Sequence, residues 1–120
     1  MRTLGIGTRK YTQVAVLDEP GQGNANHEYQ VRTSHKENEP WEILGNISFQ
    51  NGPIKEAGVN GVMNEDLIAI VIDRMRSFQS GNYACRDNAL ALTKLEEALM
   101  WLRNRTNERE DRGVEGTHVI

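Results

Sequence analysis

The fold is decided by residues 64–112, NEDLIAIVIDRMRSFQSGNYACRDNALALTKLEEALMWLRNRTNEREDR. Over residues 64–79, apolar side chains recur at the spacing that places them on one face of an α-helix. Residues 80–82 are turn formers. A second helical pattern then covers residues 83–112 and is followed by a glycine, which is common just after the end of a helix. This stretch predicts a helical hairpin.

The two helices of the hairpin differ in length. Asn64 is expected to be the N-cap of the first helix, with Glu65 and Asp66 placing negative charge in its first turn. At 1.5 Å per residue, the first helix is about 24 Å long and the second about 45 Å, so about half of the second is left uncovered. The β-sheet is one candidate to cover part of it. A second copy of the chain is the better expectation, because small residues spaced by seven let another helix approach closely. The apolar stripe is Cys85, Leu92, Leu95, Leu99 and Leu102, and the small residues are Ala84, Ala91 and Ala98.

Residues 1–50 have the period of β-strands. Residues 11–17 and 27–33 alternate and are rich in β-branched or aromatic side chains. Residues 19–26 lie between them and are turn formers, which predicts a hairpin with a long, mobile tip. A third strand is expected within residues 41–50. The sequence therefore predicts a small antiparallel sheet that needs something to pack against.

These patterns together predict an α+β protein in three parts. Residues 1–50 form the β-rich N-terminal region, residues 51–63 an irregular connector, and residues 64–120 the helical hairpin domain with a C-terminal tail. The connector is rich in glycine and asparagine. Two interpretations of it stay open, an ordinary linker and a loop that lines a ligand site.

Composition limits the classes of function. The 120 residues carry a formal net charge of −3, whereas proteins that bind nucleic acids are usually basic, so no DNA or RNA polymer is expected as a partner. Cys85 is the single cysteine and excludes an intramolecular disulfide. The N-terminus lacks the apolar core of a signal peptide, and the longest apolar run, residues 67–72, is too short to span a membrane. We expect a cytoplasmic protein without membrane contact.

Side chains that could carry catalysis have no suitable partners in the sequence. His27, His35 and His118 fall in a predicted strand, a loop and the tail, and none has a partner at metal-ligand spacing. Glu96 and Glu97 are adjacent on a helix, so they point about 100° apart and do not form a catalytic pair. We therefore predict no catalytic residue, no metal site and no cofactor.

An aromatic ring and a carboxamide near the hairpin turn form the first candidate site. Phe78 is the last apolar residue before the turn, and Asn88 lies one to two turns into the second helix. Such a pair can stack a purine and hydrogen-bond its edge. The alternative is a core phenylalanine with an asparagine on a polar face.

Four arginines near the end of the second helix form the other candidate feature. Arg105 and Arg109 are spaced i,i+4 and repel each other unless an anion lies between them, and planar guanidinium groups suit phosphate. The alternative is a solvated helix end, where cations complement the helix dipole and Glu108 can pair with the last arginine. The four arginines are Arg103, Arg105, Arg109 and Arg112.

The two features are far apart on one helix. Asn88 and Arg105 are separated by 17 positions, about 25 Å along the axis. A ligand of mononucleotide size can contact both only if a neighbouring copy packs antiparallel and brings its arginines to the hairpin turn.

Several runs in the second half resemble the hairpin domain of phage anti-defence signal sponges. They are FQNGPIKE at 49–56, GVNG at 58–61, FQ at 78–79, YACRDNALAL at 83–92, LEEALMWL at 95–102, RT at 105–106, Arg109 and RGVEGT at 112–117. Two families share this hairpin. One is the first-described Thoeris anti-defence type, which has a β-rich N-terminal region, and the other is a shorter anti-CBASS sponge with helical material before the hairpin. The strand-like first half here is similar to the Thoeris type.

The resemblance implies a function. A member of this family would bind glycocyclic ADP-ribose, the signal made by TIR-domain enzymes, and withhold it from its effector without cleaving it, in the cytoplasm of the infected bacterial host. It would assemble as a hexamer, a trimer of dimers, and would also capture cyclic di- or trinucleotides of CBASS at separate sites. Two alternatives are a cyclic-nucleotide-degrading enzyme and a structural oligomerisation module without a ligand.

The resemblance also implies roles for single residues. Phe78 would stack on the adenine, Asn88 would hydrogen-bond the ligand beside it, and Arg105 and Arg109 of another protomer would meet the pyrophosphate. The contribution of the connector around Lys55 is left open. A cyclic-oligonucleotide site near a symmetry axis would be lined by Arg112, Gly113, Gly116 and Thr117.

Overall fold

The computed structural model describes residues 1–7, 10–34 and 38–120, and His35, which the sequence places in a loop, lies outside these residues. The chain divides into two compact units, Met1–Val62 and Met63–Ile120. Over the residues that the structure describes, no helix combines the length and the apolar character needed to cross a membrane.

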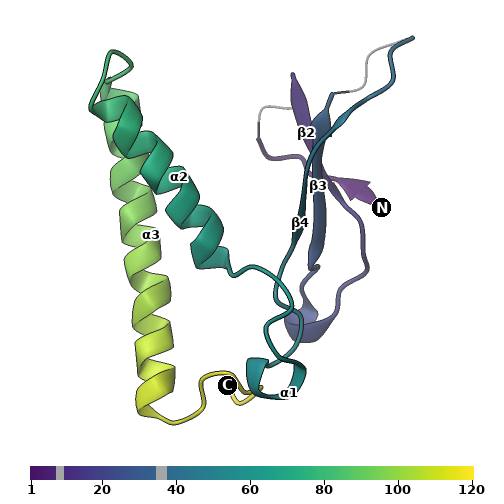
Figure 1. Ribbon diagram of the computed structural model, residues 1–120, viewed down its shortest axis with the longest axis vertical. Helices are drawn as coiled ribbons and strands as arrows, with labels where there is room; N and C mark the ends of the chain where they lie inside the picture. Colours follow the sequence, from purple (N-terminus) through teal and green to yellow (C-terminus); the bar gives the residue numbers. More distant parts are fainter. Residues whose placement is uncertain (8–9, 35–37) are drawn as a thin grey trace. The chain divides into compact units, whose positions relative to one another are not determined.

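The first unit is a four-stranded antiparallel sheet with the strand order β1-β2-β3-β4 (Figure 1). The prediction of an α+β protein with an antiparallel N-terminal sheet followed by helices is confirmed. The prediction of three strands is wrong, because a two-residue strand at the N-terminus pairs with the next strand. A strand this short has no detectable alternation. The strands are β1 Arg2–Thr3, β2 Thr12–Val16, β3 Glu28–Thr33 and β4 Ile43–Ser48.

One face of the sheet is apolar and the other is polar. Val14 pairs with Val31, and Tyr29 pairs with both Val16 and Ile47, so these side chains share a face. On the opposite face, polar side chains pair across β3 and β4, with hydrogen bonds of 3.1 Å from Gln30 to Asn46 and 2.6 Å from Ser48 to Glu28. Among the described residues of this unit, the buried hydrophobic side chains are Ala15 and Val16.

The connection between β2 and β3 is organised by the carboxylate of Asp18. It accepts hydrogen bonds from the backbone N–H groups of His27 (3.0 and 3.2 Å) and Glu28 (3.2 Å). The predicted tip contains a 3-10 turn, η1 Gln22–Asn24, whose first carbonyl lies 3.2 Å from Nε2 of the buried His27. Desolvation raises the pKa of Asp18, but the hydrogen bonds outweigh it, and the net pKa is lowered.

The connector after β4 contains more structure than the sequence predicts. It includes a short helix, α1 Ile54–Ala57, and Val62 forms a parallel bridge with Phe49. Side-chain amides replace part of a regular ladder: Asn60 exchanges hydrogen bonds of 2.8 and 2.7 Å with the backbone of Asn51. At Gly61 a Cβ would lie 2.4 Å from the carbonyl carbon of Phe49, so the two backbone segments approach too closely for any other residue.

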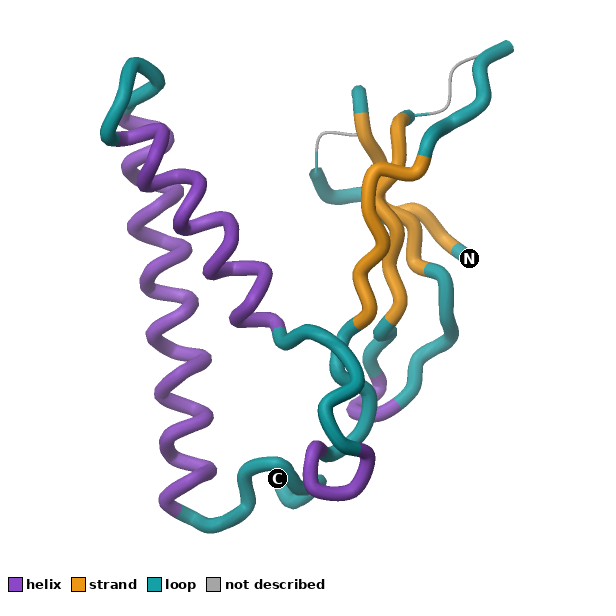
Figure 2. The backbone as a smooth tube through the Cα atoms, in the orientation of Figure 1, coloured by secondary structure: helices purple, strands orange, loops and turns teal. Residues whose placement is uncertain are grey.

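The second unit is the predicted hairpin, made of α2 Asn64–Gln79 and α3 Arg86–Asp111 (Figure 2). The N-cap of α2 is Met63 rather than Asn64, because the Asp66 carboxylate reaches back to accept the Met63 N–H at 2.8 Å. The second helix begins at Arg86 instead of residue 83, since Gln79 holds the preceding turn by two hydrogen bonds to the backbone of Cys85 (3.1 and 3.2 Å).

The contact between α2 and α3 leaves most of their apolar side chains partly exposed. The leucine stripe of α3 is half-buried, and Ile72 of α2 is the buried hydrophobic residue of this unit among those described. The outer surface keeps large apolar groups, such as Trp101, of which 61% is exposed. The small residues predicted to admit another helix are also exposed: Ala84, Ala91 and Ala98.

Replacing Asp18 should weaken the first unit in a pH-dependent way. Because its pKa is lowered in the folded chain, the stabilisation by its carboxylate is complete above the unfolded pKa and is lost as the pH falls through the folded value. We expect Asp18→Asn to lower the Tm at pH 7, and the difference from wild type to narrow below about pH 4. Thermal unfolding followed by circular dichroism measures this. Glu19→Gln makes the same change of charge one residue away and should follow the wild-type curve. A difference for Asp18→Asn that is the same at all pH values would contradict this role.

Candidate ligand-binding site

The hairpin turn gathers aromatic, amide and guanidinium groups. The rings of Phe78 and Tyr83 lie 5.9 Å apart between centroids and are nearly perpendicular, at 84°. The guanidinium of Arg74 lies 5.0 Å from the centroid of the Phe78 ring. Asn88 donates from Nδ2 to the carbonyl oxygen of Tyr83 at 3.2 Å. The structure thus brings the predicted residues Phe78 and Asn88 to one turn, where Tyr83 contacts both, and we name these four residues the turn cluster.

Local hydrogen bonds fix the turn cluster. Gln79 binds the backbone of Cys85 from the end of α2. The sulfur of Cys85 then accepts the backbone N–H of Asn88 at 3.4 Å and caps α3. Phe78 therefore stands in the last turn of one helix and Asn88 in the first turn of the next, at the same end of the hairpin.

Two members of the turn cluster were not predicted as site residues. Arg74 precedes Phe78 by four positions on α2, so the i,i+4 rule places both on one helix face, and this signal was available in the sequence. The sequence pattern predicts Tyr83 as the start of the second helix, whereas Tyr83 lies in the turn with 74% of the residue exposed. Because the turn is longer than predicted, the ring of Tyr83 can contact Phe78.

Arg105 lies near the other end of α3. It is exposed, and among the described residues no hydrogen bond or ion pair involves it, so its guanidinium can bind an anion. Asn88 and Arg105 belong to the same continuous helix, which keeps them about 25 Å apart along its axis. Within one copy, the structure does not bring Arg105 to the turn cluster.

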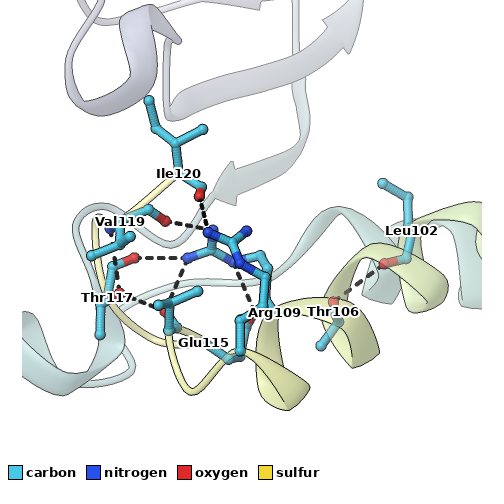
Figure 3. A network of polar contacts seen from close by, with 9 residues as sticks. Leu102, Thr106, Arg109, Glu115, Thr117, Val119 and Ile120 are labelled. Carbon is cyan, nitrogen blue, oxygen red and sulfur yellow. Dashed lines mark hydrogen bonds and ion pairs between the residues drawn. The ribbon is translucent and has the colours of Figure 1, made fainter.

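Arg109 makes extensive contacts within its own chain (Figure 3). Its side chain is buried, with 8% of the residue exposed. Nε pairs with the carboxylate of Glu115 at 3.1 Å, and the other nitrogens donate to three backbone carbonyls. A guanidinium has five N–H donors, and four of them are used here. The carbonyls belong to Val114 (3.0 Å), Thr117 (3.1 Å) and Val119 (2.6 Å).

These contacts occupy most of the donors of Arg109. A single N–H of its guanidinium remains for a ligand, and its role at a pyrophosphate stays a prediction. Arg109 and Arg105 therefore differ in availability although they share a helix face. No pattern in the sequence indicates the burial of Arg109, because its partners come from the fold of the tail and not from the helix.

The residues predicted for a cyclic oligonucleotide lie together in the tail that Arg109 binds. Gly113 and Gly116 have positive φ angles of 73° and 79°, the left-handed region that favours glycine. Thr117 hydrogen-bonds the carbonyl of Val114 through its hydroxyl. Arg112 caps α3 and donates to the carbonyl of residue 120 at 2.7 Å. All four predicted residues thus belong to one folded segment after the helix.

A groove of about 450 Å³ lies between α2 and α3. Of the four arginines singled out in the sequence it is lined by Arg103, and it contains neither Phe78 nor Asn88. It is crossed by an exposed ion pair between Arg76 and Glu96, with an N–O distance of 3.1 Å. Over residues 1–7, 10–34 and 38–120, no three or more His, Cys, Asp or Glu side chains are placed to hold a metal ion. Cys85 is free and exposed.

Comparison with known proteins identifies the class of the hairpin. Residues 42–106 match the family described as the Acb2/Tad1 hairpin domain. The chain belongs to this family, as the resemblance predicted. It is also 65% identical over 75 residues to Thoeris anti-defense 1 of Bacillus phage SBSphiJ7, an alignment that covers 62% of this chain and 53% of the relative.

The extent of the match matters for the site. The aligned part spans about half the length of the curated relative. The family match includes the turn cluster and Arg105, but it ends at residue 106, before Arg109 and the tail. The hairpin end that carries Phe78 and Asn88 is therefore the part shared with the family.

Removing the guanidinium of Arg109 should release the tail. Arg109→Ala deletes four hydrogen bonds and leaves the Glu115 carboxylate without its ion-pair partner, and we expect a loss of about 1–3 kcal/mol of local stability. The amide of Val114 donates to the carbonyl of Arg109, and the amide of Thr117 donates to the carbonyl of Val114. Hydrogen exchange of both amides should then accelerate by about tenfold or more.

Arg103→Ala is the matched control, because it removes the same charge from an exposed position of the same helix. It should leave exchange in the tail unchanged. Equal exchange rates in wild type and Arg109→Ala would show that the tail does not depend on Arg109.

Proposed function

We propose that the protein binds a small cyclic nucleotide immune signal and withholds it from its effector in the infected host cell. The ligands proposed are glycocyclic ADP-ribose and the cyclic oligonucleotides of CBASS. The name of the 65% identical phage relative, Thoeris anti-defense 1, supports the anti-defence role. The observation that carries the proposal is the turn cluster, which joins an aromatic ring and a carboxamide at the family's shared hairpin end.

The chemistry of the turn cluster suits a nucleotide base. The ring of Phe78 offers a face for stacking, and stacking on aromatic side chains is a common way to hold unpaired bases. The side chain of Asn88 carries a carbonyl acceptor and two N–H donors, so it can form hydrogen bonds with the edge of a purine base. Its present bond to the Tyr83 carbonyl uses one of these donors and leaves the amide oxygen available.

The same groups support binding without reaction. Phe78 and Asn88 carry no ionisable group, and the guanidinium of Arg105 can bind an anion through charge-assisted hydrogen bonds. They can hold a ligand by stacking, hydrogen bonding and charge. A sponge of this kind works when its sites outnumber the signal and bind it below the concentration that activates the effector.

Assembly of several copies is part of the proposal. The 25 Å between Asn88 and Arg105 cannot be spanned within one copy, whereas antiparallel packing of two copies of α3 places the Arg105 of one beside the turn cluster of the other. Exposed apolar side chains on α3, among them Leu90 and Trp101, supply surface for that contact. We propose a homo-oligomer of this type, a hexamer built as a trimer of dimers.

The tail is the second site proposed. Its folded segment would line a separate pocket for cyclic oligonucleotides through Arg112, Gly113, Gly116 and Thr117. Arg109 holds the backbone of the tail by hydrogen bonds, and in this proposal Arg105 and Arg109 of another copy contact the pyrophosphate of glycocyclic ADP-ribose.

Ligand recovered from the complex should be chemically unchanged. We expect the purified protein to deplete glycocyclic ADP-ribose from solution, and heating the complex should return the same compound in an amount equal to that bound. Chromatography with mass detection measures both quantities. An altered ligand would indicate a degrading enzyme. If neither glycocyclic ADP-ribose nor a cyclic trinucleotide is depleted, the protein would be a structural oligomerisation module without a ligand.

Mixing two defective variants should restore part of the binding. Phe78→Ala and Arg105→Ala are each expected to lose capture of glycocyclic ADP-ribose. In oligomers co-expressed from both, about a quarter of the sites combine the intact Phe78 of one copy with the intact Arg105 of another, if copies assemble at random. Calorimetric titration gives the number of restored sites. A double variant carrying both changes is the control and should stay inactive, and mixed oligomers without any restored site would contradict a shared pocket.

A further inference from the structure

Arg74 covers the ring that the proposed site offers to a base. Its guanidinium lies 5.0 Å from the centroid of Phe78, and the side chain is exposed. Among the described residues, Arg74 has no hydrogen bond and no ion pair, so this cation–π contact is what holds its head group. Arg76, two residues further along α2, is different because it is paired with Glu96 at 3.1 Å.

A cation–π contact at an exposed site is weak, and a stacked base gains more from the same ring than a guanidinium does. The ring of Tyr83 stands at 84° to that of Phe78, so it borders the ring edge-on and does not stack parallel to it. A base that stacks on the face covered by Arg74 must therefore displace the guanidinium. The displaced group keeps five N–H donors, and its best new partner is an anion.

We propose that Arg74 lies on Phe78 in the free protein, gives up this face to the base, and turns to the phosphate groups of the same ligand. This inference rests on the proposed function and adds to it a residue that selects nucleotides over nucleosides. A nucleoside loses the cation–π contact without compensation. A nucleotide replaces it with charge-assisted hydrogen bonds, which are stronger.

The position of Arg74 gives it a role that Arg105 does not have. It comes from the same copy as Phe78 and stands one helical turn before it, so its charge is at the base-binding end before any partner contributes. The chain carries a net charge of −3 and therefore needs local cations to attract an anionic ligand. Arg74 supplies one at the ring itself.

The test compares a charged and a neutral ligand on two arginine variants. Arg74→Ala should weaken binding of glycocyclic ADP-ribose by about tenfold or more, while binding of adenosine stays equal or becomes up to about fivefold tighter, because the ring is already free. Arg76→Ala changes the net charge equally on the same helix, so it controls for long-range electrostatics and should change the ratio of the two affinities little. Isothermal titration, with adenosine measured by competition, gives both dissociation constants.

Two results would overturn the inference. One is an unchanged ratio of the two affinities in Arg74→Ala, as when both ligands are weakened equally, and the other is a ratio that changes as much in Arg76→Ala. Native mass measurements of each variant show whether the oligomer is intact, and Arg74→Lys, which keeps the charge, should retain more affinity for the charged ligand than Arg74→Ala. Failure of wild type to bind glycocyclic ADP-ribose would instead overturn the proposed function, so the two failures are distinguishable.

Discussion

A single continuous helix, α3 Arg86–Asp111, carries Asn88 in its first turn and Arg105 near its last. Its backbone hydrogen bonds fix the rise per residue, so the distance of about 25 Å between these residues cannot shorten without breaking the helix. Any ligand that needs both the carboxamide and the free guanidinium therefore needs two copies of the chain. In the proposed function, an oligomer would thus complete the binding site as well as stabilise the fold.

The same helix contributes to the small size of the hydrophobic core, because much of its apolar surface is uncovered within one copy. The hairpin buries one hydrophobic side chain of its own among the described residues, Ile72, while Trp101 and Leu90 stay exposed on α3. Small domains that bury little apolar surface are marginally stable alone. Helices of a partner copy would cover these side chains. Within each unit, polar contacts stabilise segments that the small core does not hold. Asp18 holds the β2–β3 connection, Gln79 the hairpin turn and Arg109 the tail.

Periodic patterns in the sequence predict the parts of the fold that depend on apolar faces. The hairpin and the three longer strands follow from such patterns, and the end of α3 follows from Gly113. Features set by single side-chain contacts were missed. The Asp66 carboxylate shifts the N-cap of α2 to Met63, and the hydrogen bonds of Gln79 shift the start of α3 to a later residue. Apolar periodicity does not predict these contacts, because they depend on individual polar side chains. At the site, the approach of Phe78 and Asn88 was predictable from the hairpin, whereas the burial of Arg109 depends on a tail without periodicity.

The arginines of the second unit differ in whether their guanidinium groups already have partners within the chain. Arg109 is buried and nearly saturated by the tail, and Arg76 is paired with Glu96. Arg74 and Arg105 have no such partners among the described residues, and they lie near opposite ends of the hairpin. In the antiparallel packing that we propose, one unpaired arginine from each copy would lie beside the same aromatic ring. An anion held between them would lower their mutual repulsion, so binding of the ligand and contact between the copies would stabilise each other.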